Sequence, residues 1–152
     1  MLGKWFAPSH QQKQTGTGQR SARLAVRGVV FDAAGRVFVV RHTHASGCYL
    51  PGGYVAAGES AMMALARELE EKNDILLACA PLLHGLFFDE RMGEHIACYV
   101  VRDFSQSRPR EPDWQTAKAG FFAIDCLPAE PSRATRARLD EVLHGASISL
   151  AW

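Results

Sequence analysis

The sequence predicts a single α/β domain over residues 21–152, in which a mixed β-sheet is sandwiched between α-helices. Segments with strand and helix character follow one another in the order strands, helix, strands, helix, which is typical of a layered α/β structure. The chain has 152 residues, of which 47% are hydrophobic and 22% are charged. A chain of this size and composition can bury a core without disulfides.

The first 20 residues predict a flexible basic leader. No Asp or Glu occurs before Asp32, whereas Lys4, Lys13 and Arg20 do, and residues 11–19 are rich in Gln, Thr and Gly. This composition favours a solvated segment, with contact to phosphate or to a partner as the alternative. The net charge of only +1 provides no field to attract nucleic acid, so no nucleic-acid partner is expected.

The N-terminal part of the domain predicts a hairpin followed by a glycine turn. Apolar residues alternate through residues 21–30, and residues 37–41 form a second strand-like run. Residues 32–36 between them have the composition of a tight turn, so the two strands are expected to pair. A polar loop over residues 42–47 and a short extended piece then lead into Pro51-Gly52-Gly53.

The clearest helix is predicted over residues 61–72. Ser60 is a good N-cap, and the residues that follow are almost all good helix formers. Asn73-Asp74 should end the helix. The expected apolar stripe consists of Met62, Leu65, Ala66 and Leu69.

The C-terminal half predicts more strands and a second helix. Expected strands cover residues 75–80 and 82–88, bent at Pro81, then residues 95–102 and 120–124, with a polar loop over 104–116. Ser132 should cap a final helix that runs to about His144. Its inward side chains are expected to be Leu139, Val142 and Leu143.

Several classes of protein and site are disfavoured. No apolar run approaches the roughly 20 residues that cross a bilayer, so no membrane association and a cytoplasmic location are expected. The cysteines form no Cys-x-x-Cys pair, which favours reduced thiols over a disulfide framework. The six histidines lack the spacing of a zinc site, and no Gly-x-Ser-x-Gly or Walker loop occurs.

The segment from Gly53 to Ile75 contains the chemically informative residues. It reads Gly, five residues, Glu59, seven residues, and then Arg-Glu-Leu-Glu-Glu-Lys-Asn-Asp-Ile. A glycine turn lets the backbone approach a metal or phosphate closely. Helix residues three and four apart share a face, so Glu68, Glu71 and position 72 should point roughly together. Carboxylate and carbonyl oxygens are the ligands that Mg²⁺ prefers.

This segment resembles the Nudix box, and seven of its nine fixed positions match. We take the resemblance to cover about Ser21 to His144. It implies a Nudix fold and a Mg²⁺-dependent hydrolase, with Mn²⁺ as a substitute metal. The implied substrate is a small-molecule nucleotide, a nucleoside diphosphate linked to another moiety, whose pyrophosphate bond is cleaved by metal-activated water. Relatives often dimerise, so a homodimer is a further expectation.

The resemblance also implies roles for individual residues. The carbonyl of Gly52 and the carboxylates of Glu68 and Glu71 occupy metal-ligand positions, and both acids count among the expected catalytic residues. Arg67 and Glu59 would brace the loop against the helix. Arg41 and Leu50 lie where relatives line the base or sugar pocket.

Two positions depart from the box. Lys72 stands where the family places a principal metal-ligand Glu, and Asp74 replaces the usual Gly. Further on, Gln115 and Lys118 occupy places where relatives often carry an acid, which leaves as candidate substitutes Asp113, Glu90 and Glu94.

Two interpretations of the altered box follow. Either Glu68 and Glu71 hold one metal while Lys72 binds a phosphate, or hydrolysis is lost and the pocket only binds or senses a nucleotide-like ligand. We favour the first. If Lys72 suppresses Mg²⁺ binding, a Lys72→Glu change should raise both Mg²⁺ affinity and turnover.

Overall fold

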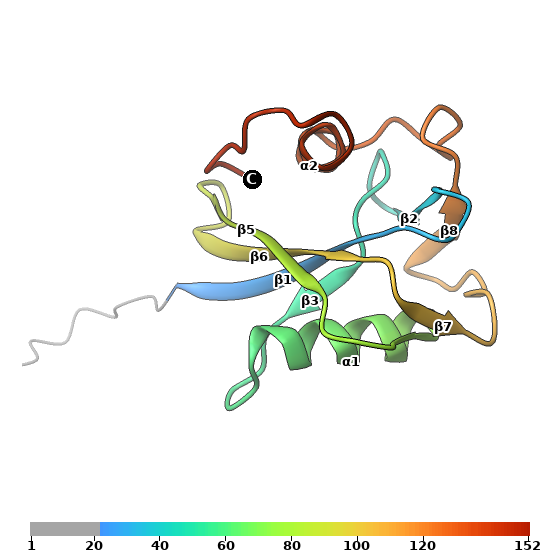
Figure 1. The fold of residues 1–152 in the computed structure, drawn as a ribbon, viewed down its shortest axis with the longest axis horizontal. Coiled ribbons are helices and arrows are strands. Elements are labelled where there is room, and N and C mark those ends of the chain that lie inside the picture. The colour runs from blue at the N-terminus through green and yellow to red at the C-terminus, as the bar shows by residue number, and fades with distance from the viewer. Residues whose placement is uncertain (1–21) are drawn as a thin grey trace, which may run out of the picture.

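A four-stranded mixed sheet forms the centre of the molecule, with one helix against each face (Figure 1). The computed structural model describes residues 22–152, so the predicted leader lies outside the described residues. The strand order is β3-β1-β6-β5. β1 (Arg23–Val30) pairs antiparallel with β3 (Gly52–Tyr54) and parallel with β6 (Glu94–Val101), and β6 pairs antiparallel with β5 (Leu82–Asp89). The predicted sheet between helices is confirmed.

The predicted hairpin between the first two strands is wrong beyond a single antiparallel bridge between Phe31 and Val37, next to the turn. β2 (Val37–His42) leaves the central sheet and pairs with β8 (Thr116–Phe122). The tight turn exists, because the amide of Gly35 donates to the carbonyl of Asp32 at 3.0 Å. Both edges of β1 are, however, already occupied by β3 and β6, so β2 finds its partner elsewhere.

A second small sheet also differs from the prediction. β4 (Ile75–Leu77) is shorter than expected and pairs with β7 (Phe104–Gln106), which lies inside the predicted loop. β7 was not predicted, because a strand of only three residues is too short to show an alternation of apolar and polar residues. Among residues 22–152, no helix is long and apolar enough to span a membrane.

Helix α1 (Ala61–Asn73) begins and ends as predicted. The Ser60 hydroxyl accepts from the amide of Met63 at 3.2 Å, and the helix ends at Asp74, which has φ 55. The apolar stripe is shifted, since Ala64 is buried and Met62 is 39% exposed. The reason is that α1 packs closely on β1, where Gly28 leaves room for Leu65.

Each face of the central sheet buries its own apolar cluster. Alternate residues of β1 contribute to the two sides, as the pleat of a strand requires. Val26 packs with Leu65 and Leu69 of α1. Val29 packs with Phe87 of β5 and with Leu139 of helix α2 (Arg133–His144).

A buried ionic group fastens α2 to β5, and we call Arg138, Glu141 and His84 the clasp. Nη2 of Arg138 donates to Oε1 of Glu141 at 2.7 Å, and Oε2 of the same carboxylate lies 2.7 Å from Nε2 of His84. The Arg138 guanidinium lies 3.7 Å from the centre of the Phe87 ring. Its Nη1 also donates to the carbonyl of Ala151 at 3.2 Å, so the clasp fixes the C-terminal segment as well.

The four cysteines are free thiols, as predicted. Cys48 and Cys98 are buried, and burial raises the pKa of the Cys98 thiol to about 12. Cys98 is therefore protonated at neutral pH and contributes to the core as a small apolar residue.

Candidate functional site

The glycine turn and α1 meet without any gap. A Cβ placed on Gly53 would lie 2.2 Å from Cδ of Glu68, and one on Gly52 would lie 2.0 Å from the carbonyl oxygen of Val26. A larger residue at Gly52 would therefore have to displace the backbone of β1, and one at Gly53 would have to displace the Glu68 carboxylate. The Glu68 carboxylate is held in the contact between turn and helix, where the residue is 6% exposed.

Arg67 connects the turn, the loop before α1 and the helix itself. Its Nε and Nη2 donate to the two carboxylate oxygens of Glu59 at 2.8 and 3.0 Å, and Nη2 also donates to the carbonyl of Tyr54 at 3.0 Å. Nη1 donates to Oε1 of Glu68 at 2.9 Å. These hydrogen bonds from Arg67 lower the pKa of Glu59 to about 2 and raise the pKa of the guanidinium. The pair is the bidentate kind that fixes geometry.

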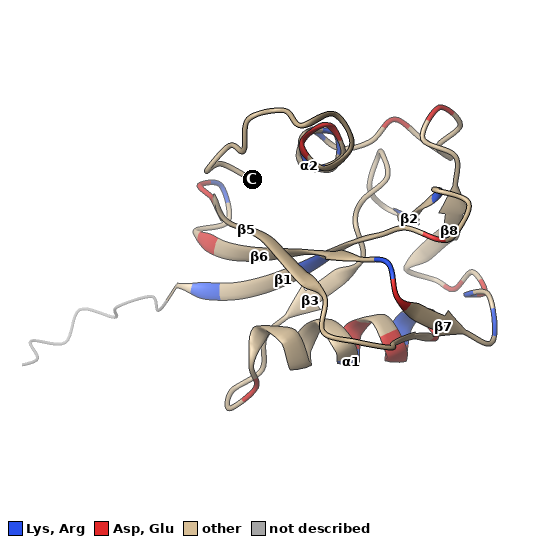
Figure 2. Cartoon of the chain, viewed as in Figure 1, with Lys and Arg blue, Asp and Glu red and all other residues tan. Residues whose placement is uncertain are grey.

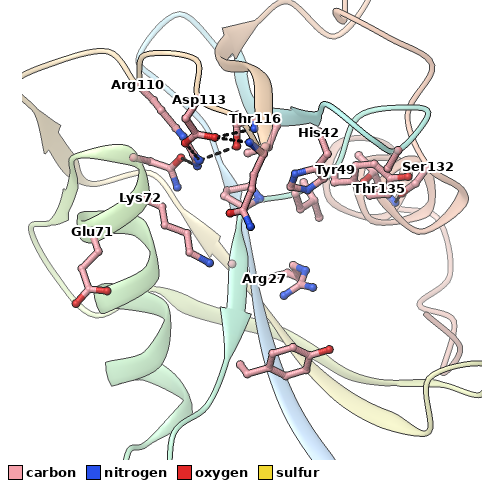
Figure 3. A pocket seen from close by; sticks show the side chains of 18 of the residues that line it. Arg27, His42, Tyr49, Glu71, Lys72, Arg110, Asp113, Thr116, Ser132 and Thr135 are labelled. Carbon is pink, nitrogen blue, oxygen red and sulfur yellow. Dashed lines mark hydrogen bonds and ion pairs between the residues drawn. The ribbon is translucent and has the colours of Figure 1, made fainter.

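Lys72 occupies the place where a metal ligand was expected. Its Nζ lies 2.5 Å from Oε2 of Glu68, while the side chain of Glu71 is 64% exposed and turns away from the turn (Figure 3). Glu59, Arg67, Glu68 and Lys72 together form what we call the box cluster. The structure thus brings Glu68 to Gly53 and directs Glu71 elsewhere.

The residues of the box cluster do not fit a divalent cation. An ammonium group already neutralises the carboxylate that Mg²⁺ or Mn²⁺ would need, and a protonated lysine cannot coordinate a metal. Among residues 22–152, no group of three or more His, Cys, Asp or Glu side chains is arranged to hold a metal ion. The substitute acids lie apart: Glu94 is buried near Arg23, and Asp113 bonds within its own loop.

A cleft of about 1360 Å³ opens between the end of α1, β2, β3 and the segment 108–116 (Figure 3). Leu50, Gly52 and Lys72 line it, and so does Glu71 at the edge. The exposed Arg41 is not among the lining residues, whereas its neighbour His42 is. Desolvation lowers the pKa of His42, and the positive charges of Arg110, Arg27 and Lys72 lower it further.

Asp74, the second departure from the box, positions one wall of the cleft. Its carboxylate accepts from the amide and hydroxyl of Ser107 at 3.0 and 2.7 Å and from the amide of Arg108 at 2.7 Å. These bonds lower the pKa of Asp74. A glycine here would allow the same left-handed turn but could not hold the loop.

Arg110 joins the same wall to the helix end. Its Nη1 donates to Oδ1 of Asn73 at 3.2 Å, and its Nη2 donates to Oγ1 of Thr116 at 2.6 Å and to Asp113 at 3.0 Å. Both acidic and basic residues lie along the C-terminal end of α1 and the segment beside β7 (Figure 2).

Sequence reasoning missed several lining residues, and Arg27 and His42 are two of them. Arg27 lies in the middle of β1, between the buried Val26 and Gly28. A charged residue inside an otherwise apolar central strand was the available signal. The interpretation of His42 as an ordinary polar residue lacked such a signal, because an exposed strand end gives no indication of a cleft.

Comparisons with known proteins agree with this geometry. A model of the NUDIX domain matches residues 21–143. The crystal structure of a MutT NUDIX hydrolase from Burkholderia pseudomallei is 30% identical in sequence, with 80% of this chain and 98% of that chain covered at a TM-score of 0.66. A comparison with curated proteins gives no significant match.

More distant solved structures share the fold. A MutT protein from Bacillus halodurans is 20% identical over 80% of this chain and 82% of that chain, with a TM-score of 0.65. An ADP-ribose pyrophosphatase from Streptococcus suis is 16% identical over 85% and 96%, with a TM-score of 0.58. With the family model covering most of the chain, and with the glycine turn, Glu59 and Arg67 in contact as the box requires, this protein belongs to the Nudix family.

Proposed function

We propose that the cleft binds a nucleoside diphosphate linked to another moiety and that the protein hydrolyses its pyrophosphate bond slowly, with Lys72 limiting turnover. The observation that carries the proposal is the cleft itself, which is bordered by the glycine turn and by both basic and acidic side chains. Its volume of about 1360 Å³ can accommodate a nucleotide with a second moiety attached. Solved structures with the same fold include the ADP-ribose pyrophosphatase and a UDP-X diphosphatase, whose names refer to compounds of this kind.

A second candidate function is ligand binding without turnover, in a sensing or regulatory role. The specific observation in its favour is the ion pair of 2.5 Å between Lys72 and Glu68. This pair occupies a carboxylate that Nudix chemistry requires for a cation. The same ligand class serves both candidates, so binding and turnover must be measured separately.

The decisive experiment is a panel of nucleoside triphosphates, nucleotide sugars and dinucleotides, assayed for binding by calorimetry and for product release. Each compound is tested with MgCl₂, with MnCl₂ and with EDTA. We expect binding of at least one nucleoside diphosphate compound by the native protein, and slow product release. In Lys72→Glu, turnover with Mg²⁺ should rise by at least about tenfold, which corresponds to about 1.4 kcal/mol in the barrier.

The matched control is Arg133→Glu, which makes the same charge change on an exposed residue of α2 that does not line the cleft. Its turnover should equal that of the native protein. Equal Mg²⁺ affinity and turnover in Lys72→Glu and in the native protein would reject the limiting role of Lys72. Tight binding with no product in either protein would select the second candidate.

A further inference from the structure

Arg27 is a partly buried cation without an acidic partner. Its Nη1 donates to the carbonyl oxygen of Val26 at 2.7 Å and lies 3.5 Å from that of Gly53. No carboxylate oxygen of residues 22–152 lies within the 4.0 Å of an ion pair, although Glu94 and Glu68 are near enough to influence its charge. Charges that lose water are normally paired, so this guanidinium has binding capacity left over.

The free side of Arg27 lines the cleft, and Lys72 enters the same space from α1. Figure 3 shows the ammonium end of Lys72 directed toward Arg27, whereas Glu71 on the same helix is directed away. The Lys72 side chain is 50% exposed, so solvent or a ligand can reach its remaining N–H groups. His42 and Arg110 line the cleft nearby. At position 72 the cleft therefore offers a cation where the box of the family offers an acid, and Arg27 adds a second cation. Carboxylates also line the cleft, those of Glu70, Glu71, Asp74, Asp89, Glu94, Glu111 and Asp113.

We propose that Arg27 and Lys72 bind the diphosphate of the ligand directly, in place of a divalent cation. The two side chains together carry the charge of one Mg²⁺ ion. A guanidinium presents paired N–H donors that match two phosphate oxygens, and an ammonium acts as a compact point charge. The ligand class rests on the proposed function; the new element is that recognition of the diphosphate needs no metal.

The arrangement also explains why Glu68 stays in place. In a site without a metal, a buried carboxylate would be left with an uncompensated charge. Arg67 donates a hydrogen bond to Glu68 and Lys72 forms an ion pair with it, which keeps the carboxylate in contact with Gly53. Lys72 thus offsets the charge of Glu68 and leaves its N–H groups available to the ligand.

The test is calorimetric titration of inorganic pyrophosphate and of ADP in EDTA and in MgCl₂. We expect both probes to bind in EDTA, with a Kd that Mg²⁺ does not improve. Lys72→Met and Arg27→Met should each raise the Kd in EDTA roughly 10- to 100-fold, the effect of losing a hydrogen bond to a charged group. Arg133→Met removes an exposed cation that does not line the cleft and should leave the Kd unchanged.

Two further measurements keep the test decisive. Thermal unfolding checks that Arg27→Met is folded, and Arg27→Lys retains the charge and should recover part of the affinity. Lys72→Glu should abolish pyrophosphate binding in EDTA. A requirement for Mg²⁺ in the native protein would overturn the proposal, as would unchanged affinity in both Met variants.

The two proposals fail in different ways. If ADP binds only with Mg²⁺, the direct contact is wrong and the proposed function stands. If neither a nucleoside diphosphate nor pyrophosphate binds under any condition, both are wrong. If pyrophosphate binds in EDTA but no nucleotide compound binds, the metal-independent site stands and the nucleotide assignment fails.

Discussion

The clasp and the box cluster have similar chemistry in opposite surroundings. Each contains an arginine bonded to a glutamate and a second basic side chain bonded to a glutamate of the same group. In the clasp the side chains of Arg138 and Glu141 are 0% and 3% exposed. In the box cluster the acidic side chains of Glu59 and Glu68 are only 13% and 7% exposed, but their basic partners Arg67 and Lys72 are 31% and 50% exposed.

The difference shows where this chain can change its chemistry without losing its fold. Breaking a buried pair strands a charge away from water and is strongly destabilising, whereas an exposed pair contributes little. The clasp must keep its charges because it joins α2, β5 and the C-terminal segment. Lys72 of the box cluster is half exposed and lines an open cleft, so it can be exchanged for the opposite charge.

The largest expected effect is the loss of stability when the clasp is broken. Arg138→Met should lower the free energy of unfolding by about 3–5 kcal/mol, because it leaves Glu141 buried without its cation. Urea denaturation followed by circular dichroism measures this. Arg136→Met, on the exposed side of the same helix, should cost under about 1 kcal/mol. Equal losses in the two variants would contradict the structural role of the clasp.

A backbone change tests how tightly the box cluster is packed. Gly53→Ala should cost about 1–3 kcal/mol, because the new Cβ would overlap the Glu68 carboxylate, and it should also weaken ligand binding. Gly120→Ala is the matched control, since its Cβ would meet nothing closer than 3.7 Å. Its stability should stay within about 1 kcal/mol of the native protein. A fully stable Gly53→Ala protein with native affinity would show that the turn and helix do not need this contact.

The pH dependence of stability should reveal the pair between Glu59 and Arg67 in the box cluster, although this pair contributes little to the free energy of unfolding. Glu59 has a folded pKa of about 2 against an ordinary value of 4.5. Its charge therefore stabilises the fold above pH 4.5, and this contribution is lost as the pH falls from 4.5 toward 2. Glu59→Gln should be less stable than the native protein at neutral pH, and the difference should shrink over that range in urea titrations.

The clasp provides the comparison for that experiment. Although burial opposes the shift, hydrogen bonds from His84, Ser149 and Arg138 lower the pKa of Glu141. Glu141→Gln should likewise lose most stability at neutral pH, with a larger deficit because the site is buried. A difference for Glu59→Gln that does not change with pH would mean that its charge has no role in stability.

The smallest effect is expected at Asp74. Asp74→Gly removes three hydrogen bonds to the cleft wall but suits the left-handed turn, so the net change in unfolding free energy should be under about 1 kcal/mol. The amides of Ser107 and Arg108 should nevertheless exchange hydrogen faster. Asp74→Asn, which retains an acceptor oxygen, should show less of this effect. Unchanged exchange in Asp74→Gly would remove Asp74 from the positioning role.

The elements with local signals could be predicted from the sequence. Ser60, Ser132 and the runs of helix formers placed both helices, and the alternation around Val26 placed the central strand. Pairing could not be predicted in the same way. The predicted hairpin is wrong because β1 pairs with one strand more than 20 residues away and with another more than 60 residues away. Pairing between such distant segments leaves no signal in the local sequence.

The features of the site likewise divide into those that the sequence could predict and those that it could not. The spacing of Glu59, Arg67 and Glu68 was enough to predict the family and the loop-to-helix contact. The ion pair between Lys72 and Glu68, the outward rotation of Glu71 and the position of Arg27 depend on how the strands assemble. The spacing of residues along a helix determines which side chains share a face. It does not determine which of those side chains contacts the glycine turn.

The exposure of Lys72 has a consequence for the history of this protein. A side chain that is half in solvent on a helix surface can pass from glutamate to lysine by a single substitution while folding is preserved. Descent from an ancestor with an acid at this position would then require no compensating change in the core.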